Sequence, residues 1–431
     1  MEPRRVVVTG LGVLAPNAHG PGEFVTALRE GRSGIRFQAH LKESGFACQV
    51  GGIPVGVETL QSSYLTQEEL FAMNPNMVYA AIAAIDAWRD AGFSRPDASS
   101  DEVDWDTGAI IGTGVGGIDT VAEKLGPKTD AGKVSRLGSA MVEQVMSSGN
   151  SARVAGLLAL GNQVTTNSSA CNTSTEAIAD AFFRIREGRA ERMLAGGSEG
   201  CSKYSWAGFD AMRVLNRTKN AEPERASRPM SATAAGFVPA SGAGILVLES
   251  LDSAVRRRAR IYAELLGAFV NSGGHRSGGS MTAPNPLGVR RCIQGAVAMA
   301  KVDSTEIGAI NGHLTATMAD ALEINNWCAA LELRPDRMPW LHSTKSLIGH
   351  ALGAAGAIES IAVVLELVHG FVHGSANCED LHPELAPFAD RVVHSSRDVP
   401  ELEIIAKASF GFGDVNGCLI WKKWKGNGAL A

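Results

Sequence analysis

Short apolar runs that end in glycine or polar residues alternate with longer segments in which apolar residues recur every three or four positions. The short runs have the length of buried strands, and the periodic segments have the spacing of one helix face. The expected strands lie at residues 5–9, 109–111, 192–195, 243–249, 307–310 and 403–408. Strands that alternate with helices predict an α/β protein.

Two of the predicted helices stand in matching surroundings, since each follows a polar turn and precedes a strand that ends in glycine. Their apolar faces are Ile178, Ala181, Phe182 and Ile185 in the first helix, and Ile358, Ile361, Ala362, Leu365 and Val368 in the second. This match of pattern predicts a duplicated α/β fold. We expect two halves, 1–250 and 251–424, followed by a flexible tail at 425–431.

The composition narrows the classes of function. Of the 431 residues, 45% are hydrophobic and 20% are charged, as in a soluble α/β protein. The net charge of −5 argues against nucleic-acid binding. The 7 cysteines include no CxxC pair, so neither a disulfide framework nor a zinc site is indicated, and a cytoplasmic location is expected. No apolar run approaches the roughly 20 residues that span a membrane.

One cysteine stands where the pattern changes from strand to helix. Cys171 follows polar residues 165–167 and precedes the helical stripe that begins at Ile178. A thiol at a helix N-terminus faces unpaired N–H groups and the positive end of the macrodipole, and both favour the thiolate. The sequence therefore predicts a lowered pKa for Cys171 and a nucleophile that accepts an acyl group. A buried, inert cysteine is the alternative.

Two histidines occupy similar positions later in the chain. His313 follows the expected strand at 307–310, and Lys345 and His350 precede the second apolar helix. One cysteine and two histidines at element ends form a suitable set for thioester chemistry that stabilises developing charge. Structural roles are expected for His19, His40, His342, His369, His373, His382 and His394.

Two short motifs suggest other enzymes. Residues 112–117 match the GxGxxG of dinucleotide-binding proteins, but no second strand with an acidic end follows them. Residues 196–200 match the GxSxG of serine hydrolases, but no apolar helical stripe follows Ser198. A serine hydrolase is therefore retained only as the alternative enzyme class.

The segments around Cys171, His313 and Lys345–His350 resemble, in order and spacing, those of elongating β-ketoacyl-acyl carrier protein synthases, the thiolase-like condensing enzymes. The resemblance runs from residues 6–12 to 410–417. It implies a thiolase-like, duplicated five-layer α/β/α/β/α sandwich. It also implies an acyltransferase that condenses a bound acyl thioester with malonyl-carrier protein, with loss of CO₂, in fatty acid or polyketide elongation. A non-catalytic partner subunit of such an enzyme would lack Cys171.

The resemblance also implies a role for individual residues. Cys171 would be the nucleophile, His313 and His350 the decarboxylation pair, and Lys345 the source of a local field. The remaining implied residues are Glu359 as partner of Lys345, Phe412 and Phe410 as oxyanion and gating residues, Thr315 and Thr317 as pantetheine contacts, and Val115 at the far end of the acyl tunnel. No resident cofactor or metal is implied, because phosphopantetheine arrives on the carrier protein.

The chain departs from the family pattern beside two of these motifs. Leu314 and Ala316 stand where the family has glycine and serine, and Asp414 and Val415 replace glycine and threonine in the gating loop. These departures affect the acyl-chain range and the gate, and they suggest a specialised branch such as a polyene pathway. By resemblance, the apolar segment 127–160 predicts a two-fold interface. The expected partners are an acyl carrier protein and either a second copy or a synthase-like homologue.

Overall fold

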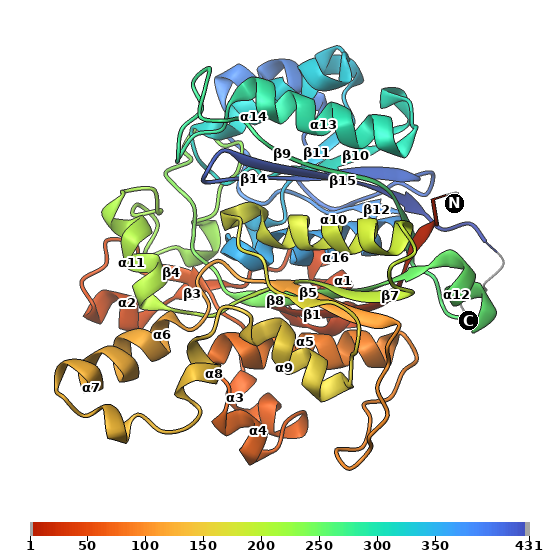
Figure 1. The fold of residues 1–431 in the computed structure, drawn as a ribbon. Coiled ribbons are helices and arrows are strands. Elements are labelled where there is room, and N and C mark those ends of the chain that lie inside the picture. The colour runs from red at the N-terminus through yellow and green to blue at the C-terminus, as the bar shows by residue number, and fades with distance from the viewer. Residues whose placement is uncertain (1–2, 427–431) are drawn as a thin grey trace.

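In the computed structural model, which describes residues 3–426, two sets of strands lie on either side of a central pair of helices (Figure 1). The first set, in spatial order, is β1 (Val6–Ala15), β8 (Gly242–Ser250), β7 (Arg192–Glu199), β5 (Thr107–Gly112) and β6 (Val164–Thr165). The second set is β9 (Ala263–Ser272), β15 (Val415–Lys423), β14 (Ile404–Gly411), β10 (Ala309–Asn311) and β11 (Trp340–His342). A short pairing of β1 with β9 at Val6–Val8 joins the two sets.

The two sets have the same topology. If the strands of each set are numbered along the chain, their spatial order is 1-5-4-2-3 in both. The two pairings nearest the junction are antiparallel and the two outermost are parallel, again in both sets. The duplication that the sequence pattern predicted is therefore present in the strand topology, and the second copy begins after β8.

Five layers stack in the order helix, sheet, helix, sheet, helix (Figure 1). The outer layer on the first set is α5 (Pro75–Asp90) with α9 (Gly149–Leu158), and that on the second set is α13 (Pro286–Ala300) with α14 (Ala319–Leu331). The central layer is α10 (Thr173–Arg186) and α16 (Ala355–His369), which pack against each other. This is the thiolase-like sandwich that the resemblance implied.

The central helix α16 is buried on every side, although the sequence predicted one apolar face. All residues from Ala355 to Leu367 are buried, because sheets cover the helix on two sides and α10 covers a third. Gly356 lets α10 approach, since a Cβ at this position would collide with the Thr175 hydroxyl. Among the described residues, only Leu352–His369 has the length and hydropathy of a membrane span, and 89% of it is buried in this core.

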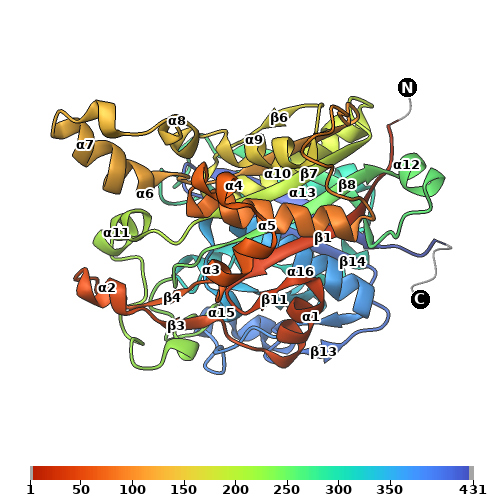
Figure 2. The same ribbon diagram turned by 90° about the horizontal axis from the view of Figure 1, so that it is seen from below.

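Several strands are longer than the apolar runs predicted. β1, β7 and β14 continue through their glycines because the backbone keeps pairing with neighbouring strands there. Residues 127–160 contain α8 (Met141–Val145) and α9, and residues 203–237 contain α11 (Lys203–Ala211). The segment α6 (Ile118–Thr120) to α7 (Gly126–Asp130) projects from the body in both views (Figures 1 and 2). Of the expected tail, residues 427–431 lie outside the described residues.

The remaining short elements connect these layers. They are β2 (Ala18–His19), α1 (Gly20–Glu30), β3 (Ile35–Phe37), α2 (Ala39–Glu43), β4 (Val50–Gly52), α3 (Val57–Leu60), α4 (Gln67–Phe71), α12 (Leu251–Arg256), α15 (Lys345–Ile348), β12 (Phe371–Val372) and β13 (Arg397–Asp398). The α15 segment matters most for function, because it carries Lys345 at the end of β11.

Candidate active site

Cys171 lies in a sharp turn that leads directly into α10. The residue before it, Ala170, has a φ of 51°, a left-handed conformation that is strained for a side chain with a Cβ. Thr173 holds this turn, since its hydroxyl accepts from the Ser169 N–H at 2.8 Å and donates to the Ala170 carbonyl at 2.6 Å. The turn therefore presents the thiol at the helix N-terminus, as the sequence predicted.

The predicted lowering of the Cys171 pKa is wrong in the free protein. Burial raises the pKa of this thiol to about 11 and outweighs the opposite effects of Lys345 and of the Phe412 backbone N–H. Desolvation disfavours the thiolate more than the helix end favours it. The backbone N–H groups of Cys171 and Phe412 nevertheless act to lower this pKa.

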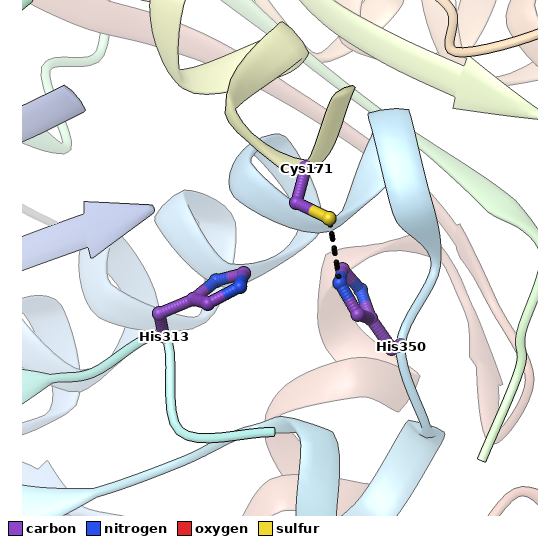
Figure 3. A group of neighbouring side chains, drawn as sticks. All are labelled: Cys171, His313 and His350. Atoms are coloured by element: carbon purple, nitrogen blue, oxygen red, sulfur yellow. Dashed lines mark hydrogen bonds between the residues drawn. The ribbon is translucent and has the colours of Figure 1, made fainter. Parts of the chain in front are cut away.

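His350 contacts the nucleophile and has a defined tautomer. Its Nε2 lies 3.1 Å from the Cys171 Sγ (Figure 3). The Leu352 backbone N–H donates to the His350 Nδ1 at 3.2 Å, so the ring proton is on Nε2. The ring therefore presents an N–H donor to the cavity in front of the sulfur.

His313 faces the same cavity from the other side (Figure 3). Its ring centroid lies 5.3 Å from that of His350, and the two planes meet at 83°. Glu323 holds the His313 loop by accepting from the backbone N–H of His313 at 2.7 Å and of Leu314 at 2.8 Å. Burial and the neighbouring cations lower the pKa of both histidines well below the usual value, so both rings are neutral.

A buried charge network lies behind the two histidines. Lys345 forms an ion pair with Glu359, as the resemblance implied. Glu359 also contacts a second lysine, Lys407 of β14, whose Nζ lies 3.0 Å from its Oε2. All three side chains are inaccessible to solvent. Two lysine side chains thus share one carboxylate.

A cavity of about 420 Å³ opens in front of Cys171, His313 and His350. The expected residues Thr315, Thr317, Phe410 and Phe412 all line it. The two threonine hydroxyls lie 3.0 Å apart. Phe410 is buried against the ring of His313, and the ring of Phe412 lies near Phe209.

Val115 lies apart from these residues. It does not line the cavity, and its side chain is 50% exposed. Its backbone N–H donates to Glu199, as does that of Gly114 at 2.7 Å. Its role at the end of an acyl tunnel stays a prediction.

The two alternative motifs have structural explanations. In the GxGxxG segment, the Glu199 carboxylate accepts the backbone N–H groups that a phosphate would need. In the GxSxG segment, Ser198 lies inside β7, is inaccessible to solvent and donates to the Asn76 carbonyl at 2.8 Å. A serine hydrolase that uses Ser198 is therefore excluded.

The reactive side chains lie close enough to act together. The Cys171 sulfur, one nitrogen of His313 and one nitrogen of His350 lie within 4.8 Å of one another. A second buried group of this kind consists of His342, Glu366 and His373. Its histidines bond each other and Thr344 rather than the cavity residues, which fits the structural role expected for them.

Family models for the N-terminal and C-terminal domains of β-ketoacyl synthases match residues 3–254 and 262–379. The chain belongs to the β-ketoacyl synthase family. It is 35% identical to 3-oxoacyl-[acyl-carrier-protein] synthase 2 of Vibrio harveyi, over 98% of this chain and 99% of that one.

Two solved structures relate this synthase to polyketide enzymes. The ishigamide ketosynthase/chain length factor matches with a TM-score of 0.87 and 29% identity, over 98% of this chain and all of the other. A type II polyketide synthase acyl carrier protein in complex with its hexaketide-bound ketosynthase matches with a TM-score of 0.85 and 28% identity, with the same coverage.

Sequence reasoning missed three residues that organise this synthase site: Glu199, Glu323 and Lys407. All three are buried charges. Lys407 interrupts an apolar strand and Glu199 ends one, and a charge in a strand pattern was the available signal. Glu323 lies on α14 and gave no signal, because its partners are backbone N–H groups of a distant loop.

Proposed function

We propose that this synthase elongates acyl chains on an acyl carrier protein, with Cys171, His313 and His350 as its catalytic residues. The observation that carries the proposal is the convergence of these side chains on one cavity, with their reactive atoms within 4.8 Å of one another. The sequence separates them by up to 179 residues, so only the duplicated fold brings them together.

The first half-reaction is transfer of the acyl group to Cys171. The thiolate attacks the thioester carbonyl, and the N–H groups of Cys171 and Phe412 hold the resulting oxyanion. The C–S bond to the carrier then breaks, and the carrier sulfur leaves as a thiol with the proton that Cys171 lost. Gly411 makes room for this geometry, since a Cβ there would lie 3.1 Å from the backbone nitrogen of Cys171.

The second half-reaction begins with loss of CO₂ from the malonyl thioester. Electrons of the breaking C–C bond move into the thioester, and its oxygen becomes an enolate. The His350 Nε2–H is directed at this position, and the His313 ring lies beside it. Donors already in place stabilise the enolate without reorganisation. The enolate carbon then attacks the acyl group on Cys171 and releases the thiolate and the β-ketoacyl product.

A carrier protein and a partner subunit complete the proposal. A related ketosynthase forms a complex with an acyl carrier protein, and another is described as a ketosynthase/chain length factor. Exposed apolar side chains gather in the 115–146 region: Val115, Val121, Val134, Val142 and Met146. An apolar surface of this kind is typical of a subunit interface. We infer a homodimer or a heterodimer with a synthase-like homologue.

Intact-protein mass spectrometry tests the proposed function. Mixing with acyl-carriers of graded chain length should add one acyl group to the protein and none to the Cys171→Ala variant. Subsequent addition of malonyl-carrier protein should remove the acyl group from Cys171 and yield β-ketoacyl-carrier protein. Acylation of the Cys171→Ala variant, or no acylation of the native protein by any chain, would contradict the proposal.

A further inference from the structure

Lys407 connects the elements that carry the reactive groups. It lies on β14, two residues before Ser409 and five before Phe412. Its Nζ donates to the Ser409 hydroxyl, to the Ala408 carbonyl at 2.9 Å and to the Thr175 hydroxyl at 3.2 Å. Thr175 belongs to α10, whose N-terminus follows Cys171.

The surroundings of Lys407 define its charge. An ammonium group has three N–H donors. Here they are accepted by the Ser409 hydroxyl, the Ala408 carbonyl and the Thr175 hydroxyl. The Glu359 carboxylate supplies the counter-charge at 3.0 Å. A neutral amine would leave this shared carboxylate with a single cation, Lys345. Burial lowers the pKa of Lys407, and the Glu359 carboxylate opposes this shift. The three acceptors and the carboxylate together fit the charged form in spite of complete burial.

The titratable groups that face Lys407 come from four elements. Glu359 lies on α16, Lys345 on α15, Glu323 on α14, and the Cys418 thiol on β15. Beyond Lys345 lie the rings of His313 and His350, and both lysines lower the pKa of each ring. Lys345 and Glu359 balance each other as an ion pair, so Lys407 is the cation in excess of this pair.

We propose that Lys407 is a positioning residue of the condensation site: it shares Glu359 with Lys345 and supplies a second fixed positive charge behind the two histidines, which stabilises the enolate. This inference rests on the proposed function. A positive charge in a dry interior acts over a longer range than it would in water, so Lys407 contributes without touching substrate.

The experiment compares neutral variants of Lys407 with a matched control. Lys407→Met removes the charge and keeps the length of the side chain, whereas Lys407→Gln also keeps hydrogen-bonding capacity. Thr175→Val removes one of the hydrogen bonds to Nζ but leaves the charge. Circular dichroism and thermal melting first show whether each full-length variant folds like the native protein. If Lys407→Met does not fold, Lys407→Gln is used as the neutral variant.

Three quantities are then measured: acyl-enzyme yield, kcat and KM for malonyl-carrier decarboxylation, and the titration of ¹³Cε1-labelled histidines by NMR. We expect both Lys407 variants to acylate fully, to lose about tenfold in kcat with little change in KM, and to titrate His313 and His350 at least about half a pH unit higher. Thr175→Val should change neither the titration nor the kcat by this amount.

The outcomes separate this inference from the proposed function. A native protein that neither acylates nor decarboxylates would refute the function itself. An active native protein with unshifted histidines and unchanged kcat in the Lys407 variants would overturn the inference alone. Equal losses in Thr175→Val and the Lys407 variants would also overturn it, because they would indicate a packing role.

Discussion

The Nε2 of His350 lies 3.1 Å from the Sγ of Cys171, and it carries a proton because the Leu352 N–H occupies Nδ1. His350 is thus a hydrogen-bond donor toward the cavity and not a base that removes the thiol proton. This relationship separates the acylation step, which depends on Cys171 and the backbone N–H groups, from the decarboxylation step, which depends on the histidines.

The first prediction concerns reactivity of the nucleophile. Because burial raises the pKa of Cys171 to about 11, its alkylation by limiting iodoacetamide should be slow at pH 7 and should accelerate continuously up to pH 9. It should still react before the four buried cysteines, Cys48, Cys292, Cys378 and Cys418, since it opens on the cavity. Peptide mapping measures both, and faster labelling of Cys418 would contradict the prediction.

The second prediction separates the histidines from the cysteine. His313→Ala and His350→Ala should form acyl-enzyme but lose roughly 10²–10³ in the rate of condensation, as expected when one donor to a developing oxyanion is removed. Mass spectrometry follows acylation, and product chromatography follows condensation. Loss of acylation in both folded variants would show that the two steps share these residues.

A third prediction concerns the gating loop. Asp414 is buried with a φ of 59°, and its carboxylate accepts from the N–H of His275 at 3.0 Å and of Asn285 at 2.7 Å. It therefore ties the turn after Phe412 to residues 273–285. Asp414→Gly should lower the free energy of unfolding by about 1–3 kcal/mol, since the buried Asn285 N–H and the partly buried His275 N–H lose their acceptor.

The same variant should change gate kinetics. With the carboxylate gone, acylation should become faster while the final yield of acyl-enzyme stays the same, because a gate controls rate and not equilibrium. Acylation time courses quenched at intervals measure both the rate and the final yield. A lower final yield at an unchanged rate would argue against control of the gate by Asp414.

The fourth prediction tests the tunnel end. Val115 is exposed in the single chain, in the region inferred to meet a partner subunit. Val115→Phe should block loading of long acyl-carriers while short ones still load, because a pocket wall selects chains by length. Val142→Phe, at another exposed position of the same region, is the control. Equal loss for all lengths would place the tunnel end elsewhere.

The fifth prediction concerns stability in acid. Burial lowers the pKa of His373 to about 4, whereas the unfolded chain has the usual value near 6.5. As the pH falls from about 6.5 to 4, the unfolded state binds a proton that folded His373 does not, so roughly 3 kcal/mol of stability is lost. Urea unfolding across this range should show the loss, and His373→Asn should reduce its slope. An identical slope would assign the acid sensitivity to other groups, such as His342.

Spacing along the chain predicted the α/β class and the duplication. It also singled out Cys171, His313 and His350, whose catalytic role the family resemblance implied and which stays a prediction. Apolar periodicity depends only on local backbone geometry, so the helices after Cys171 and His350 could be predicted from sequence. The oxyanion amide of Phe412 came from family resemblance alone, since a backbone N–H has no sequence signature.

The tertiary structure decided the electrostatics. The helix end at Cys171 predicted a lowered pKa, but burial reversed its direction. Lys407 was one residue in an apolar strand until the fold placed it against Glu359. Such effects depend on which distant groups share a dry interior, and neighbours along the chain do not specify this. The sequence by itself determined which groups stand at the ends of elements, and packing between the two halves determined their charge.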